Sequence, residues 1–428
     1  MPSGLLENQQ AGPEGMVKHT TSFSFPYLFK WLVLVLIVGT AAGTLSALFL
    51  TSLNLVTDFR NGHYWLIYFL PLAGLVVGLL YHYTGKGVER GNNLIFDTVH
   101  NPKDIIPFKM VPLVLGGTLL SHLFGGSAGR EGTALQMAGA TADQLHKPFR
   151  LDAADRTILL ISGLSAGFAS IFGTPLAGIV FGIEVLLLTK IPYKALLPAI
   201  VSAYTGAWVT SLWGVGHTHY HITEVLPLSV KSLACSGIAG IAFGLAAIVF
   251  VQLTESLSHL FKKIGYMPLR PLAGGIVLLL LFLIPGTYKF AGLGIPTIVE
   301  SFNVASQPQD FALKILFTAI TLGAGFKGGE VTPLFFIGAT LGSALSVFLP
   351  LPLGLLAGMG FVAVFAGAAK TPLACCVMAM ELFGLSCGIY VAIACVVAYL
   401  ISGRHSIYNA AENKTPKHLL FGKIRNVF

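Results

Sequence analysis

The stretch GSAGREGTALQMAGAT at residues 126–141 recurs in the second half of the chain as GFKGGEVTPLFFIGAT at residues 325–340. The two copies align without gaps at an offset of 199 residues. Three glycines match, Glu131 matches Glu330, and both copies end in GAT. A long motif that repeats at one offset indicates an internal duplication.

A second motif supports the duplication. TPLA at residues 174–177 returns at residues 371–374, an offset of 197, and a glutamate follows at the same distance in each copy, Glu184 and Glu381. We therefore predict two homologous halves of about 200 residues.

The composition is that of a polytopic membrane protein. Of the 428 residues, 54% are hydrophobic and 10% are charged, against about 25% charged in soluble domains. The formal net charge of +8 is spread over a chain of mean hydropathy +0.78, so we exclude a soluble domain and a nucleic-acid surface. The apolar runs long enough to cross a bilayer, about 20 residues, are Leu28–Leu53, Leu66–Tyr83, Ile191–Trp213, Leu233–Leu257 and Leu269–Ile284.

Other apolar stretches are interrupted by Gly or Pro and carry acidic residues. Non-helical backbone at membrane depth is tolerated only inside protein or beside a water-filled cavity, and duplicated transporters with broken helices bind their substrates between the halves. We predict an all-α membrane protein with two inverted-topology halves and broken or re-entrant helices at Gly125–Leu145, Gly163–Leu188, Gly323–Phe348 and Leu353–Ile401.

The repeated motifs predict an anion site. Each is Gly-rich or begins Thr-Pro and precedes an apolar helix, whose free N–H groups and positive dipole end attract anions. We expect Thr174 at an N-cap and Pro175 at the first helical position. Four short helices, beginning near Gly132, Thr174, Val331 and Thr371, are expected to point at one ion.

Glu131 is the candidate gate. A carboxylate at membrane depth is costly, and at a helix N-terminus it can occupy an anion site, leave it, or become neutral with a proton. The alternatives are an ion pair with Arg130 or a capping role. For Glu184, Glu330 and Glu381 we favour capping or bracing of helices.

These residues resemble the CLC family of anion channels and transporters. The resemblance spans Leu28–Ala410 and rests on GREGT at 129–133, TPLAG followed by an IE pair, and SIY at 406–408. GNNLI at 91–95, GREGT and GEVTP at 329–333 differ from the motifs of most members and are similar to those of the fluoride-specific branch.

The resemblance implies roles for individual residues. Glu131 would be the gating, proton-exchanging glutamate. Asn92 would replace the Ser hydroxyl of chloride transporters, Phe96 would place its ring edge on the ion or the glutamate, and Tyr408 would turn its hydroxyl to the anion. Thr332 would be the hydroxyl residue near Glu131. An ordinary helix start at Asn92, with Phe96 in the core, is the alternative.

The backbone of Gly129, Gly132 and Val331 would complete the anion site, because dehydrated fluoride needs strong N–H donors. Val185 stands where many chloride/proton exchangers have a second glutamate, so Glu131 would carry the proton alone.

The resemblance thus implies a transporter that exports fluoride in exchange for protons and works as a homodimer in the lipid bilayer. A CLC-type chloride channel or chloride/proton exchanger is the alternative. HExxH and P-loop motifs are absent from the sequence, and we expect neither an enzyme nor a cofactor or metal. His217, His219 and His221 form HxHxH, a pattern for which a metal site is a weak alternative.

We divide the chain into a polar tail (1–26), a first transmembrane repeat (27–213), a connector (214–231), a second repeat (232–410) and a basic tail (411–428). The N-terminal tail lacks the pattern of a signal peptide. Four basic residues and no acidic one after Asn413 predict a cytoplasmic C-terminus and a location in the inner (plasma) membrane.

Overall fold

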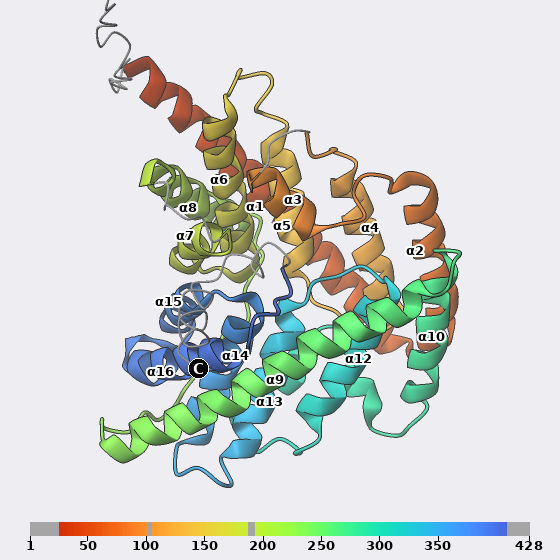
Figure 1. Ribbon diagram of the computed structural model, residues 1–428, viewed down its shortest axis with the longest axis vertical. Coiled ribbons are helices and arrows are strands. Elements are labelled where there is room, and N and C mark those ends of the chain that lie inside the picture. The colour runs from red at the N-terminus through yellow and green to blue at the C-terminus, as the bar shows by residue number, and fades with distance from the viewer. Residues whose placement is uncertain (1–24, 101–104, 187–192, 409–428) are drawn as a thin grey trace, which may run out of the picture.

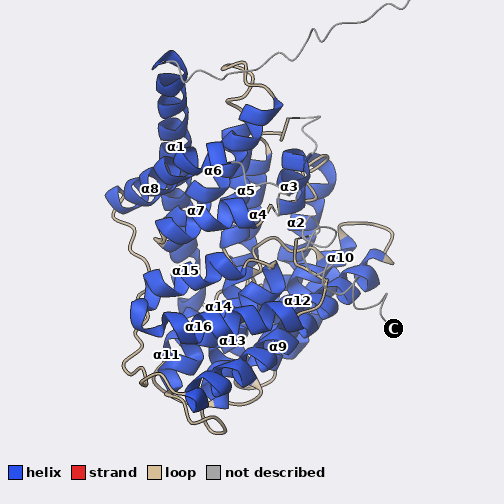
Figure 2. Ribbon diagram, turned by 60° about the vertical axis from the view of Figure 1, so that its left-hand side comes forward, coloured by secondary structure: helices blue, strands red, loops and turns tan. Residues whose placement is uncertain are grey.

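The computed structural model describes residues 25–100, 105–186 and 193–408. These residues form sixteen α-helices, four short 3-10 turns and no strand, which confirms the all-α prediction (Figure 2). The helices of the first half are α1 (Phe25–Gly62), α2 (Leu70–Thr84), α3 (Asn92–His100), α4 (Met110–Leu123), α5 (Glu131–Asp143), α6 (Ala153–Phe172), α7 (Pro175–Glu184) and α8 (Leu196–Leu212).

The second half repeats this order. Its helices are α9 (Val230–Lys262), α10 (Leu269–Phe282), α11 (Ile295–Glu300), α12 (Asp310–Ala324), α13 (Val331–Leu345), α14 (Leu353–Ala369), α15 (Pro372–Phe383) and α16 (Gly388–Ile401). The halves contact each other through equivalent helices, α2 with α10, α5 with α13 and α7 with α15. Contacts between equivalent elements are what a two-fold relation between the halves produces.

Five segments are long and apolar enough to cross a membrane, and they correct two predictions. They are Tyr27–Gly62, Tyr64–Thr84, Ala153–Phe172, Tyr193–Leu212 and Val230–Lys262. The stretch from Leu269 gives a helix of only 14 residues, α10, because the chain turns after Phe282. Conversely, α6 is a candidate span of 20 residues that was not among the runs expected to cross the membrane. The break predicted in Gly163–Leu188 falls at Gly173, since Gly163 and Gly167 allow close packing without breaking the helix.

The predicted breaks are otherwise confirmed. Helix α6 ends at Gly173 (φ 73°) and α14 ends at Lys370 (φ 64°), both in the left-handed conformation that terminates helices. A single residue, Thr174 or Thr371, then precedes a proline at the first position of α7 or α15.

The repeat register differs by one residue from the sequence alignment around the glycine loops. Gly125 and Gly325 both have left-handed φ values after a helix, and Gly129 pairs with Gly329, so the structural offset is 200 rather than 199. Glu131 is therefore equivalent to Val331, not to Glu330. Alignment by residue identity paired the two glutamates, whereas the backbone hydrogen bonds between the halves define which residues are structurally equivalent.

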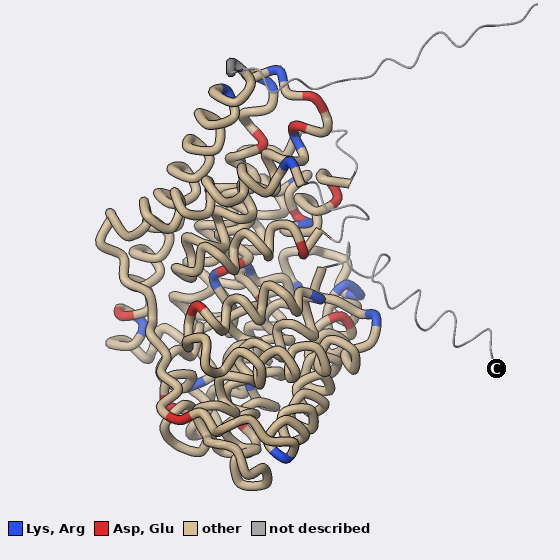
Figure 3. The backbone as a smooth tube through the Cα atoms, turned by 90° about the vertical axis from the view of Figure 1, so that its left-hand side faces the viewer, with Lys and Arg blue, Asp and Glu red and all other residues tan. Residues whose placement is uncertain are grey.

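The helices pack closely around a largely apolar interior. Figure 1 shows α9 running across its own half, where it contacts α12, α14 and α16. Helices α13 and α14 approach so closely that a Cβ on Gly338 would clash with the carbonyl oxygen of Gly360. Charged residues are few, and the tube in Figure 3 is tan over most of its length. Residues 1–24 and 409–428 lie outside the described ranges, and the proposed domain boundaries stay predictions.

Candidate functional site

The helices α5 and α13 begin at one short backbone bridge between the halves. The N–H of Gly129 donates to the carbonyl of Gly329 at 2.6 Å, and the N–H of Gly329 donates to the carbonyl of Gly129 at 2.8 Å. A Cβ on Gly329 would lie 2.7 Å from the backbone nitrogen of Gly132, so glycine is required there. Two helix N-termini therefore meet at one point, as predicted for α5 and α13.

The carboxylate of Glu131 lies at this point and is fully buried. Its Oε2 accepts the N–H of Arg130 at 3.0 Å and the N–H of Thr332 at 3.1 Å, and its Oε1 accepts the Thr332 hydroxyl. The Arg130 Nε is 3.8 Å from Oε1, at the limit of an ion pair. Glu131 thus occupies the N-terminus of the helix in the other half, the position in which an anion would bind.

Asn92, Phe96 and Tyr408 form a second group. Asn92 begins α3, and the buried ring of Phe96 meets the ring of Tyr408 edge-on with centroids 4.9 Å apart. The Asn92 Oδ1 and the Tyr408 hydroxyl are buried without a hydrogen-bond partner among the described residues. Asn92 is thus a helix start and Phe96 a core residue, as the alternative held, yet two polar groups beside them are free for a ligand.

The two groups adjoin. A Cβ on Gly132 would lie 3.0 Å from the Asn92 Nδ2, so the side-chain amide faces the first turn of α5. Gly132 and Val331 both lie in these first turns, and Val331 is buried. All the predicted site residues except the TPLA motifs are therefore brought to one region.

Cavities approach this region separately. A cavity of about 150 Å³ is lined by Asn92, Tyr408 and Glu330. It shares Lys327, Glu330 and other lining residues with a wide vestibule of about 860 Å³. A small cavity of about 20 Å³ is lined by Glu131, Thr332 and residues of the connector, and shares no described lining residue with the 150 Å³ cavity. Glu131 thus faces the small cavity and Tyr408 faces the vestibule side.

The expected convergence of four helices on one ion is wrong for two of them. The carboxylate of Glu381 accepts the N–H groups of Leu176 and Ala177 at 2.9 and 2.7 Å, which closes the N-terminus of α7. Glu184 closes α15 in the same way. Thr174 is the N-cap residue of α7, but its side chain makes no capping bond. The capping role favoured for these two glutamates fits this geometry.

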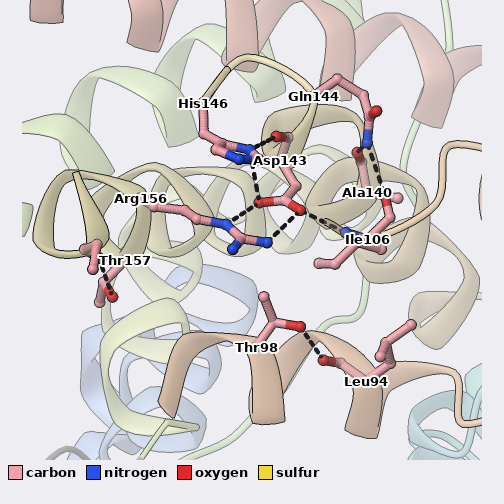
Figure 4. Close-up of polar contacts among 10 residues, drawn as sticks. Leu94, Thr98, Ile106, Ala140, Asp143, Gln144, His146, Arg156 and Thr157 are labelled. Carbon is pink, nitrogen blue, oxygen red and sulfur yellow. Dashed lines mark hydrogen bonds and ion pairs between the residues drawn. The ribbon is translucent and has the colours of Figure 1, made fainter. Parts of the chain in front are cut away.

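The far end of α5 is held by a buried ion pair, shown in Figure 4. Asp143 accepts the Nε and Nη2 of Arg156 at 2.7 and 2.8 Å and the N–H of Ile106 at 2.7 Å. His146 lies beside the same carboxylate. Both ends of the helix that carries Glu131 are therefore fixed by polar contacts.

Three buried basic residues bind backbone carbonyls, one of them in the glycine loop, and the sequence patterns did not identify them. His122 Nε2 lies 3.3 Å from the carbonyl of Gly129, Arg60 donates to the carbonyl of His122, and Lys314 donates to two carbonyls. None of the three lies in the repeated motifs that marked the other site residues. In the vestibule, Lys327 lies 4.0 Å from the centre of the Tyr81 ring.

The HxHxH motif does not form a metal cluster. The described residues contain no group of three His, Cys, Asp or Glu side chains suited to a metal ion. His217 instead lines the small cavity next to Glu131, whereas His219 and His221 are exposed.

The family follows from comparison with known proteins. Residues 73–403 match the model of the voltage gated chloride channel family. A "chloride/fluoride channel protein" of Pseudomonas syringae pv. tomato is 53% identical over 400 residues, which cover 92% of this chain and 88% of that protein. The chain belongs to the CLC family. Its CLC relatives include a "H(+)/Cl(-) exchange transporter ClcA" of Vibrio vulnificus, 26% identical over 90% of both chains.

The fold agrees with solved CLC structures. The crystal structure of a CLC-type fluoride/proton antiporter has a TM-score of 0.87 and 34% identity, over 91% of this chain and 100% of that one. A slow cyanobacterial Cl-/H+ antiporter has a TM-score of 0.77 at 20% identity, over 92% and 98%. The protein is therefore a membrane-spanning anion transport protein of the CLC type, a family of channels and transporters rather than enzymes.

Proposed function

We propose that this protein exports fluoride from the cytoplasm in exchange for protons, with Glu131 as gate and proton carrier. The observation that carries the proposal is the buried Glu131 carboxylate on the N–H and hydroxyl of Thr332. A carboxylate there competes with an incoming anion for the same donors. Protonation would weaken its hold and release the position to fluoride.

The vestibule side offers donors for a dehydrated anion. The Tyr408 hydroxyl is buried without a hydrogen-bond partner among the described residues, and the Asn92 Nδ2 faces the first turn of α5. Phe96 adds a ring edge of weak positive potential. The N-terminal backbone of α5 and α13, at Gly132 and Val331, supplies further N–H groups, whereas the N–H of Gly129 is already bonded to the carbonyl of Gly329. Strong donors favour fluoride over the more weakly hydrated chloride.

Relatives support the choice of ion. The structure with a TM-score of 0.87 is that of a fluoride/proton antiporter, and the relative that is 53% identical is named a chloride/fluoride channel protein. Chloride/proton exchange remains the competing function, because ClcA relatives match over a similar length at lower identity.

The proposal includes orientation and assembly. The basic residues after Asn413 favour a cytoplasmic C-terminus, and the vestibule lined by His405 and Ile407, just before that terminus, would then open to the cytoplasm of a cell whose plasma membrane holds the protein. From the family resemblance, the protein would be a homodimer with one ion path in each subunit.

Efflux from proteoliposomes tests the function. Vesicles loaded with fluoride or chloride are compared for the native chain, Glu131→Gln, and Glu224→Gln, a change at an exposed connector residue. We expect fluoride efflux well above chloride efflux, with opposite proton movement that Glu131→Gln abolishes and Glu224→Gln preserves. Chloride efflux equal to or above that of fluoride would contradict the fluoride assignment, and fluoride efflux without proton movement would contradict exchange.

A further inference from the structure

The small cavity beside Glu131 connects the gate to the HxHxH motif. It is lined by Glu131 and Thr332 on one side and by His217, Thr218 and Tyr220 of the connector on the other. Its volume of about 20 Å³ is close to the room that one water molecule needs, about 10–15 Å³. One water there would be within reach of polar groups on both sides.

His217 is fitted into the wall of this cavity. Its ring packs against Gly173, where a Cβ would lie 2.5 Å from the ring Cδ2, so the left-handed glycine that ends α6 makes the space. The side chain is half-buried, and its Nδ1 is fully buried with no hydrogen-bond partner among the described residues. A buried ring nitrogen without a partner needs an explanation, and water is the ordinary partner.

Burial, and after it the positive charge of Arg130, keeps the His217 ring neutral. Burial, together with the positive charge of Arg130 and the neighbouring His219, lowers the pKa of His217 to about 4, while a hydrogen bond with the backbone of Ile171 raises it. The charged groups lining the cavity are Arg130 and Glu131. A neutral imidazole between solvent and a carboxylate can take up a proton and give it away again.

Tyr220 closes the remaining space. Its ring lies 5.0 Å from that of Phe361 and 5.5 Å from that of Phe302, measured between centroids, and it is buried. Neither His219 nor His221 lines the cavity. The charged or titratable side chains among the described residues that line this cavity are Arg130, Glu131, His217 and Tyr220. Of these, the imidazole of His217 is the connector group best suited to carry a proton to Glu131.

We propose that His217 relays protons between the outer solution and Glu131 through one water molecule in this cavity. The relay rests on the proposed function and deepens it. In the inward direction a proton from outside binds the imidazole, which becomes imidazolium. The imidazolium gives a proton to the cavity water, and that water gives one to a Glu131 carboxylate oxygen. The ring ends neutral, the water is restored, and the carboxylate becomes a carboxylic acid.

Membrane vesicles of defined orientation test the relay. Right-side-out and inside-out vesicles are prepared from a host without fluoride exporters, loaded with fluoride, and assayed at several bath pH values and one internal pH. The variants are His217→Gln, the matched control His219→Gln, Glu131→Gln, and the double variant of His217 and Glu131.

In right-side-out vesicles we expect His217→Gln to slow fluoride efflux about ten-fold at neutral bath pH, with recovery as the bath is acidified, because protons must then reach Glu131 without a positioned carrier. His219→Gln is expected to match the native profile. In inside-out vesicles, the dependence on bath pH is expected to be unchanged. In the Glu131→Gln background, His217→Gln is expected to leave the remaining uncoupled fluoride flux unaltered.

Identical bath-pH profiles for the native chain and His217→Gln would overturn the relay while leaving the exchange intact. A loss of uncoupled flux in the double variant would also overturn it, because it would assign His217 a role in the fold or the anion path. Absence of proton-coupled fluoride flux in the native chain would instead refute the proposed function, and the relay with it.

Discussion

Glu184 and Glu381 each close the N-terminus of the helix that carries the other. Glu184 ends α7 and accepts two N–H groups of α15, at 2.9 and 2.7 Å, and Glu381 in α15 accepts two N–H groups of α7 at the same distances. The exchange crosses the boundary between the halves. The two carboxylates thus occupy two helix N-termini that could otherwise bind an anion, and they hold the halves together. The N-termini of α5 and α13 are the remaining pair, and they meet at Glu131.

Loss of one of these carboxylate contacts is expected to destabilise the fold. Glu381→Ala leaves two helix N–H groups without their acceptor, and we expect a loss of about 1–3 kcal/mol in the free energy of unfolding. Thermal unfolding in detergent measures it, with the exposed Glu224→Ala as control. Unchanged stability together with lost proton coupling would instead place Glu381 on the proton path.

Tyr408→Phe is expected to weaken fluoride binding without loss of stability. The hydroxyl has no described hydrogen-bond partner, and the ring contact with Phe96 survives the change. We expect an apparent affinity about ten-fold lower in concentration-dependent flux, or about 1.4 kcal/mol.

Tyr390→Phe is the matched control, since its hydroxyl donates to Leu226 and Pro227. It is expected to lower the unfolding temperature and keep the affinity. If Tyr390→Phe weakens fluoride binding while Tyr408→Phe only lowers the unfolding temperature, the assignment of Tyr408 to the anion site is refuted.

The bridge between the halves predicts a steric effect. In Gly329→Ala the new methyl group would lie 2.7 Å from the nitrogen of Gly132 and 3.2 Å from that of Glu131. We expect about 1–3 kcal/mol of destabilisation and displaced donors at the site, hence reduced flux. Gly265→Ala, where a methyl group meets nothing within 4 Å, is expected to behave as the native protein. Native flux in Gly329→Ala would mean that the bridge opens freely.

The buried ion pair at the end of α5 is expected to be sensitive to loss of one partner. Arg156→Met leaves Asp143 charged and buried, and we expect about 3–5 kcal/mol of destabilisation, seen as reduced yield and a lower unfolding temperature. Adding Asp143→Leu is expected to recover part of the loss because it removes the unpaired charge. If the double variant is less stable than Arg156→Met, loss of the hydrogen bond from the Ile106 N–H costs more stability than the unpaired buried charge does.

Thr332→Val tests how the gate is held. The change keeps the backbone N–H that binds Glu131 and removes the hydroxyl. We expect looser coupling, with more fluoride moved per proton, because a charge-assisted hydrogen bond no longer returns the carboxylate to its place. Thr332→Ser retains the donor and is expected to keep the native ratio, measured from paired fluoride and pH recordings.

The sequence predicts the breaks in the helices well because they have local causes. Thr-Pro at 174–175 and 371–372 starts a helix in each half, and glycines in the loops before Glu131 and Val331 end the preceding ones. Helix length was harder to predict. The glycines within α6 resemble a break but serve as contact points, because a tightly packed neighbour decides which role a glycine takes.

Part of the site was predictable and part was not. Glu131 and Thr332 are marked by their motifs and are joined by hydrogen bonds. The assignment of the TPLA motifs to the ion failed because a cap supplied by the other half, such as Glu381 on α7, leaves no local signal. The support of Gly129 by His122 was missed for the same reason, since the contact depends on folding and not on spacing.

The register of the repeat places different residues at equivalent positions of the two halves beside the site. Glu131 is equivalent to Val331 and Arg130 to Glu330, so a nearly symmetrical scaffold carries an acid on one side and an aliphatic group on the other. The same residue at both positions would present the same chemical group from each half. Here the two halves differ at both of these pairs of positions, so they present different chemical groups to an ion at the site.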